Sequence, residues 1–154
     1  MSKTLRLLFL VTDFFFIIYW LITFFHLIPE EYLYQDYQNE LLVIWNWSFF
    51  PLDILISATG FISLYLFKVK NEKWRAFALL SLALTFCSGL QAIAFWTIKL
   101  DFDLMWWIPN LFLLLYPLYF IPKLITFKYQ DVSLQAKQNT TTNHPRCGCV
   151  FYVL

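Results

Sequence analysis

The chain contains 154 residues, of which 60% are hydrophobic and 14% are charged, and its formal net charge is +1. Soluble domains carry about 25% charged residues, so a water-soluble fold is all but excluded. A nearly neutral chain also lacks the basic surface that nucleic-acid binding requires, and its length leaves no room for a second, soluble domain. The composition therefore predicts a small integral membrane protein whose main partner is the lipid bilayer.

Four apolar segments follow one another along the chain, at about residues 5–28, 41–67, 74–98 and 104–127. At a rise of about 1.5 Å per residue, a helix over any of them covers about 30 Å or more, the thickness of the hydrocarbon layer. They lack the period-two alternation of barrel strands, and in lipid only helices or closed barrels satisfy every backbone group. We therefore predict an all-α fold, a four-transmembrane-helix bundle in residues 1–127.

The first segment resembles a secretory signal peptide, because the basic residues Lys3 and Arg6 lie at its start. It is, however, longer than the apolar core of a signal peptide, it contains Asp13, and no small-residue cleavage site follows before Pro29. The segment is therefore expected to stay in the protein as a helix. Asp13 is also a functional candidate, because an ionisable group in hydrocarbon is costly and is seldom kept without a role.

The second segment contains Asp53 near its middle, which makes this residue the deeper of the two buried carboxylates. The helix carries one polar and small stripe, because at 100° per residue four of its residues fall within about 60° of arc. These residues are Asn46, Asp53, Ser57 and Gly60. Pro51 cannot donate a hydrogen bond to the carbonyl four residues before it, so a kink is expected close to Asp53.

The third and fourth segments add further small and polar residues. Ser81, Thr85 and Gly89 have the spacing of small residues that let helices approach closely in lipid, so we expect them to pack against a neighbouring helix. Gln91 follows on the same helix, toward its second end. On the fourth helix Asn110 has two interpretations, a bridge between helices or a residue that lines a pocket.

Lysine and arginine are distributed very unevenly between the two ends of the predicted helices. Ten of the eleven lie at one end, and Lys99 alone lies at the other. Because cytoplasmic loops retain an excess of these residues, both termini are predicted to lie in the cytoplasm, in a multi-pass protein of the cell membrane. The basic end carries Lys3, Arg6, Lys68, Lys70, Lys73, Arg75, Lys123, Lys128, Lys137 and Arg146, and the opposite, acidic end carries Glu30, Glu31, Asp36, Glu40, Asp101 and Asp103.

Residues 128–154 turn polar and are predicted to form a disordered cytoplasmic tail, because they offer no apolar face to bury. His144, Cys147 and Cys149 lie close together in this tail, but a closed zinc site takes about four ligands on a folded scaffold. No metal site and no cofactor are therefore predicted. The chain also lacks a glycine-rich phosphate loop, an HExxH motif and a nucleophile elbow, so no catalytic residue is assigned.

Several polar and aromatic residues belong to the acidic half of the helices and together predict an outward-facing pocket around Asp53. The candidate ligand-binding residues are Asp53, Asn46, Gln91, Asn110, His26, Asp13, Trp45 and Trp107. The expected ligand is a small apolar or cationic molecule or a lipid, with Asp53 as counter-ion. One alternative is a structural or regulatory subunit, in which Asp53 bonds a helix of a second copy or of another membrane protein. Another is an isomerase that moves a proton through Asp53 or Asp13.

A family resemblance rests on four runs that lie in order between Leu21 and Ile125. They read HLIPEEYL, WNWSFFPLDILISATG, LTFCSGLQAI and DFDLMWWIPNLFLLLYPL. With these runs, about four fifths of the chain resembles the YvaD-like family of small four-helix bacterial membrane proteins. This resemblance implies the four-helix fold and no particular activity.

A second similarity concerns the start of the second helix. The spacing of Trp45, Ser48, Phe49 and Asp53 is similar to that of the EXPERA group, which includes the sigma-2 receptor and the emopamil-binding sterol isomerases. In that group, membrane carboxylates bind cationic amphiphiles or stabilise a sterol carbocation. The similarity implies the same role for Asp53.

Overall fold

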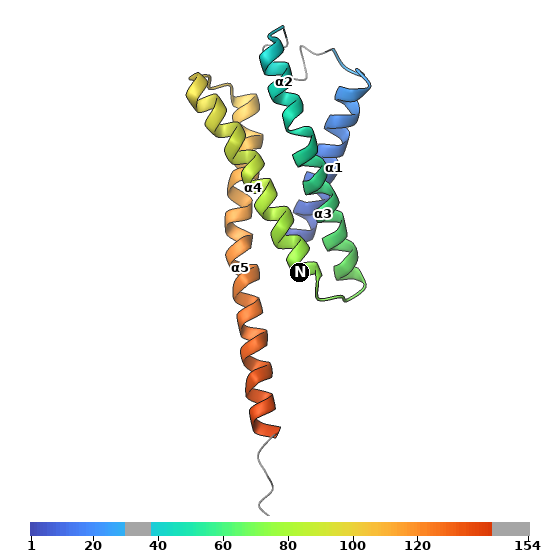
Figure 1. Cartoon of the computed structure of the whole chain (residues 1–154), viewed down its shortest axis with the longest axis vertical. Helices are drawn as coiled ribbons and strands as arrows, with labels where there is room; N and C mark the ends of the chain where they lie inside the picture. Colours follow the sequence, from blue (N-terminus) through green and yellow to red (C-terminus); the bar gives the residue numbers. More distant parts are fainter. Residues whose placement is uncertain (30–37, 143–154) are drawn as a thin grey trace, which may run out of the picture.

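The computed structural model describes residues 1–29 and 38–142, and the secondary structure in these ranges is helical throughout (Figure 1). Four stretches are long and apolar enough to cross a membrane: α1, α2 together with α3, α4, and Leu104–Thr126 of α5. The predicted all-α fold with four long apolar helices is thus confirmed. The helices are α1 (Lys3–Phe24), α2 (Glu40–Ser48), α3 (Phe50–Lys68), α4 (Trp74–Lys99) and α5 (Leu104–Thr142).

Helix α1 begins after Ser2, whose hydroxyl accepts a hydrogen bond from the backbone N–H of Leu5 at 3.2 Å and so caps the helix. The helix ends at Phe24, four residues before the predicted boundary at residue 28. Shortly after this end, His26 adopts a left-handed backbone with a φ of 49°. A left-handed residue does not continue an α-helix, which explains why α1 stops while the sequence is still apolar.

The second apolar segment is divided into α2 and α3 at Phe49. Pro51 lies at the start of α3, where its missing N–H removes a bond that would have joined the two helices. The predicted kink is therefore confirmed. The division also corrects the expected position of Asp53, which lies in the first turn of α3 rather than in the middle of one helix. Its backbone N–H donates to the Phe49 carbonyl at 2.9 Å.

The long helices pack in chain order, α1 against α3, α3 against α4, and α4 against α5. Small residues of α4 allow these contacts to be close. A Cβ atom on Gly89 would lie 2.6 Å from the backbone nitrogen of Leu114 and 2.8 Å from the carbonyl oxygen of Asn110, both on α5. On the other side, the Ser81 hydroxyl donates to the Ile56 carbonyl of α3 at 3.4 Å. The packing role predicted for these small residues is therefore confirmed.

The two ends of the bundle differ in how closely the helices pack. Toward the acidic end, α2 diverges from α4 and α5 (Figure 1), and the buried apolar cluster there consists of Trp20, Phe49 and Ala92. Toward the basic end, side chains of α1, α4 and α5 form a larger apolar core that closes the bundle. This core contains Leu5, Phe9, Ala78, Leu82, Tyr116, Phe120 and Leu124.

Helix α5 continues to Thr142, past the predicted end of the fourth segment at residue 127 (Figure 1). The expectation of a disordered tail from residue 128 is therefore corrected for residues 128–142, which are helical. The chain has no proline or glycine between Pro122 and Pro145. A helix already formed adds further residues at little cost, so nothing in this stretch stops it. The HPRCGC run of the predicted tail lies outside the described residues.

Candidate ligand-binding site

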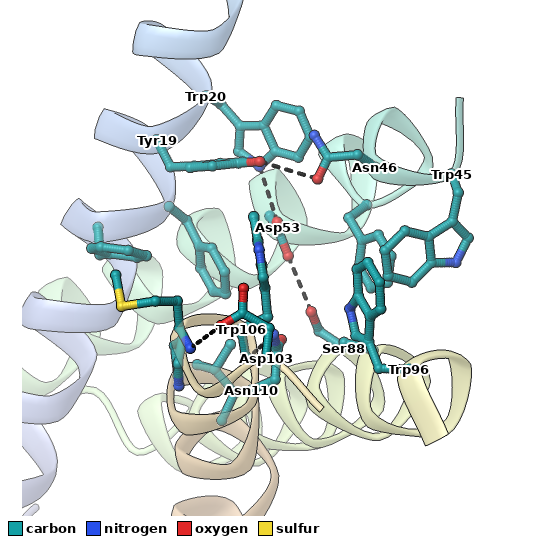
Figure 2. Close-up of a pocket in the computed structure, with 17 residues that line it drawn as sticks. Tyr19, Trp20, Trp45, Asn46, Asp53, Ser88, Trp96, Asp103, Trp106 and Asn110 are labelled. Atoms are coloured by element: carbon teal, nitrogen blue, oxygen red, sulfur yellow. Dashed lines mark hydrogen bonds between the residues drawn. The ribbon is translucent and has the colours of Figure 1, made fainter. Parts of the chain in front are cut away.

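A cavity of about 520 Å³ lies among the helices in the acidic half of the bundle (Figure 2). Pockets for small organic molecules measure about 300 to 1,000 Å³, so this volume suits one such molecule. The lining residues are Phe15, Phe16, Tyr19 and Trp20 from α1, Trp45 and Asn46 from α2, Phe49 and Asp53 at the start of α3, Ser88, Ala92 and Trp96 from α4, and Asp103, Met105, Trp106, Pro109, Asn110 and Leu113 from α5 and the residue before it.

Asp53 is 4% exposed and holds three helices together through its carboxylate (Figure 2). One oxygen accepts a hydrogen bond from the indole Nε1 of Trp20 at 2.9 Å, and the other accepts one from the hydroxyl of Ser88 at 3.3 Å. Its position in the first turn of α3 also favours a negative charge, because the helix dipole is positive there. A carboxylate has about four lone-pair positions, so these two bonds leave room for a ligand.

Asn46 provides a second polar group in the wall. Its Oδ1 accepts a hydrogen bond from the Tyr19 hydroxyl at 3.0 Å, which ties α2 to α1 (Figure 2). The Asn46 Nδ2 group is buried and has no hydrogen-bond partner. A buried donor left unpaired costs about 1–3 kcal/mol, so this amide is well suited to donate to a bound molecule.

Aromatic rings form much of the wall. Trp45 stacks on Phe95 with ring centroids 3.9 Å apart, and it meets Trp96 edge-on at 5.6 Å. Trp96 in turn stacks with Trp106 at 6.4 Å. This series of rings joins α2, α4 and α5 along one side of the cavity. The faces of such rings are electron-rich and attract cations.

The charged side chains that line the cavity are both acidic. They are Asp53 and Asp103, and no lysine, arginine or histidine belongs to the described wall. Asp103 accepts a hydrogen bond from the backbone N–H of Met105 at 2.9 Å, which caps the start of α5. Lys99 lies over the Trp96 ring at 4.9 Å but does not itself line the cavity. Two carboxylates in the described wall give the cavity a negative potential, which is strongest where water is excluded.

The bond between Trp20 and Asp53 is open to a direct test. Trp20→Phe keeps an aromatic ring but removes the donor to the carboxylate. Because a hydrogen bond to a charged group contributes about 1.5–3 kcal/mol, we expect a melting temperature several degrees lower in detergent. The control is Trp47→Phe, which changes the ring 5.4 Å from Trp20. Equal melting temperatures for the two variants would contradict a stabilising role for this bond.

Four of the eight residues predicted to bind a ligand line the cavity: Asp53, Asn46, Asn110 and Trp45. Asn46 and Asp53 share the face that the stripe on the second segment predicted, and Asn110 and Trp45 lie beside them from α5 and α2. The sequence leaves two interpretations of Asn110 open, a bridge between helices or a residue that lines a pocket, and the structure supports the second. It lines the cavity, and its Nδ2 also donates to the carbonyl of Trp106 within α5 at 2.7 Å.

Gln91 and His26 do not line the cavity, contrary to the prediction. Gln91 is exposed, because the cavity face of α4 runs through Ser88 and Ala92 and a neighbouring residue points about 100° away. His26 is also exposed, because α1 ends at Phe24 and the left-handed turn that follows takes the imidazole off the helix.

Trp107 and Asp13 also lie outside the cavity wall. The indole of Trp107 donates to the Asp101 carbonyl at 2.9 Å, so it braces the turn before α5, and the neighbouring Trp106 takes its place in the wall. Asp13 is buried on α1, seven residues before Trp20. It therefore lies about 10 Å from the level of Asp53, measured along the helix.

The two partners of Asp53 are not among the predicted site residues. A signal for Trp20 exists in the sequence, because it follows Asp13 by seven residues and so shares the face of α1 that carries a carboxylate. Ser88 gives no comparable signal. A serine beside Gly89 on a helix of small residues is typical of plain helix packing.

The fold and the cavity together define a small protein with four long apolar helices and an acidic, aromatic-walled cavity. Residues 5–131 match a family of unknown function, DUF5360, and the chain belongs to this family. The chain is 55% identical over 123 residues to the uncharacterized protein YvaD of Bacillus subtilis (strain 168), an alignment that covers 80% of this chain and 92% of that protein. The resemblance to YvaD-like proteins is thus confirmed.

The other comparisons add no further relationship. Neither the family match nor the relative supports the similarity to the EXPERA group. No solved structure matches the chain. A fold alone does not imply a function, which depends on the side chains that line the cavity.

Proposed function

We propose that this chain is a multi-pass membrane protein that binds an organic cation with apolar substituents in its cavity, with Asp53 as the counter-ion. The observation that carries the proposal is the lining of the cavity, in which both charged residues are carboxylates and aromatic rings surround them. A cation with aryl or alkyl groups matches both features. Its charge pairs with Asp53, and its apolar groups contact the ring faces.

The exposed surface supports a location in a membrane. Large apolar side chains such as Leu7, Leu55 and Leu115 are more than half exposed on the candidate spans. An apolar surface of this extent favours contact with lipid. The excess of lysine and arginine at the basic end favours cytoplasmic termini in the cell membrane, and hence a cavity in the outer half. Glu30, Glu31 and Asp36 of the acidic end lie outside the described residues.

The surroundings of Asp53 favour a cation over a neutral molecule of the same shape. The carboxylate is almost fully buried, and its described partners, the Trp20 indole and the Ser88 hydroxyl, are neutral. A buried charge without a counter-charge carries a desolvation penalty of several kcal/mol, which a cation offsets. A neutral molecule gains only from the burial of its apolar surface. We therefore expect the cation to bind at least about tenfold more tightly.

Probes that differ mainly in charge test the proposal. The protein is placed in nanodiscs of zwitterionic lipid and titrated with tetraphenylphosphonium, with methyltriphenylphosphonium or with the neutral triphenylphosphine oxide, which has the same three phenyl groups as the methyl compound. Tryptophan fluorescence reports binding, because Trp20, Trp45, Trp96 and Trp106 line the cavity. The expected result is saturable binding with a clear preference for the phosphonium cations. Equal affinities would rule out Asp53 as the counter-ion.

A further inference from the structure

Asp13 is a second buried carboxyl group, and it takes no part in lining the cavity. It is 1% exposed, and neither of its side-chain oxygens has a hydrogen-bond partner. A Cβ atom on Gly60 of α3 would lie 2.7 Å from the Cγ of Asp13. The carboxyl group therefore packs directly against α3, at a position where glycine leaves the space for it.

Two buried hydroxyl groups lie in the same part of the bundle. The Tyr116 side chain of α5 lies beside those of Thr12 and Thr85. Thr12 is 4% and Tyr116 is 7% exposed, and their hydroxyls approach each other without completing a hydrogen bond of ordinary geometry. Buried polar groups are normally paired, so the Asp13 carboxyl group, which has no partner, is the exception in this part of the bundle.

No positive side chain balances Asp13 in this part of the bundle. On α1 itself the nearest is Arg6, seven residues away, which is about 10 Å along the helix. Helix α3 presents Asp53, another carboxylate, and α5 presents Tyr116, while the facing stretch of α4 contains no charged residue. An isolated charged carboxylate in apolar surroundings is so costly that the group takes up a proton instead.

Asp13 lies between the cavity and the apolar core of the basic end. Ser57, one turn after Asp53 on α3, donates from its hydroxyl to the main-chain carbonyl of Asp13 at 3.3 Å. On the other side, the apolar core that contains Leu5 and Phe9 closes the bundle. Because Asp13 packs on Gly60, seven residues after Asp53 on α3, its carboxyl group lies about 10 Å along the helix from Asp53.

We propose that Asp13 is a proton-binding site and that an organic cation entering the cavity displaces this proton. The proposal rests on the proposed function of the cavity. A cation at Asp53 would lie about 10 Å from Asp13. At an effective dielectric constant of about 20, its charge weakens the binding of a proton to Asp13 on the order of tenfold. In this exchange a free cation and a neutral carboxyl group become a bound cation, a carboxylate and a proton that is released to water.

Dicyclohexylcarbodiimide tests the proton site without any ligand, because it reacts with neutral carboxyl groups in apolar surroundings. Labelling of Asp13 in nanodiscs is followed by mass spectrometry between about pH 5 and 9, with sodium or choline as the buffer cation. We expect labelling that falls as the pH rises and is the same in both buffers. Absent labelling, labelling independent of pH, or protection by sodium would each overturn the proton site.

Proton release tests the coupling. Wild type and Asp13→Asn are titrated with tetraphenylphosphonium in weak buffer with a pH-indicator dye. We expect Asp13→Asn to fold and bind, because the amide copies the shape of the neutral carboxyl, but to release clearly fewer protons per bound cation than the wild type. Equal release would overturn the coupling. If the wild type does not bind phosphonium, the proposed function of the cavity fails, and carbodiimide labelling alone decides on Asp13.

Discussion

Asp53→Asn is expected to weaken the binding of tetraphenylphosphonium at least about tenfold while the fold is kept. The side-chain amide oxygen can still accept the hydrogen bond from Trp20, and the amide nitrogen can donate to the Ser88 hydroxyl. The substitution thus removes the charge and little else. Fluorescence titration in nanodiscs measures the affinity, and thermal denaturation shows whether the variant is folded.

The matched control is Asp101→Asn, which removes the same charge from the same end of the bundle. Asp101 pairs with Lys99 at 3.4 Å and does not line the cavity. Its variant is expected to bind phosphonium within about twofold of the wild type, since the charge of Asp101 is already paired with Lys99 and lies outside the cavity wall. A similar loss in both variants would assign the attraction to the acidic end in general. Unfolding of both Asp53→Asn and Asp53→Glu would favour the structural-subunit alternative, in which Asp53 only joins helices.

Gly89→Ala is expected to destabilise the bundle by about 1–3 kcal/mol. The new Cβ would lie 2.6 Å from the backbone nitrogen of Leu114 and 2.8 Å from the carbonyl oxygen of Asn110. Backbone atoms cannot rotate aside, so α4 and α5 must separate. Thermal denaturation in detergent measures the loss, which outweighs the better helix propensity of alanine.

Gly60→Ala is the control, because its Cβ would meet the side chain of Asp13, which can turn away. We expect a smaller loss of stability than for Gly89→Ala, and recovery of much of that loss in the double variant Gly60→Ala/Asp13→Ala. A Gly89→Ala variant as stable as the wild type would show that the α4–α5 contact is looser than the structure indicates. Failure of the double variant to recover would mean that Asp13 is not what limits space at Gly60.

Part of the candidate site follows from helical periodicity. Asn46 and Asp53 share one face, and that face lines the cavity, because the stripe is set by the 3.6-residue repeat that every helix obeys. The same repeat does not determine which face of α4 turns toward the cavity, because α4 carries small residues on more than one face. The depth of Gln91 predicts a place in the pocket, yet Gln91 is exposed, and Ser88 and Ala92 of the same helix line the cavity.

The composition and length of the apolar segments by themselves determined the four long helices, because backbone groups in lipid have no partner outside the helix. Pro51 likewise determined the break before Asp53, since it lacks an N–H. Only the tertiary structure decided which residues meet Asp53 and that Asp13 packs on Gly60 without a hydrogen-bond partner. The physical reason is that such contacts depend on how each helix is rotated and how closely it approaches its neighbours, which small residues permit but do not specify.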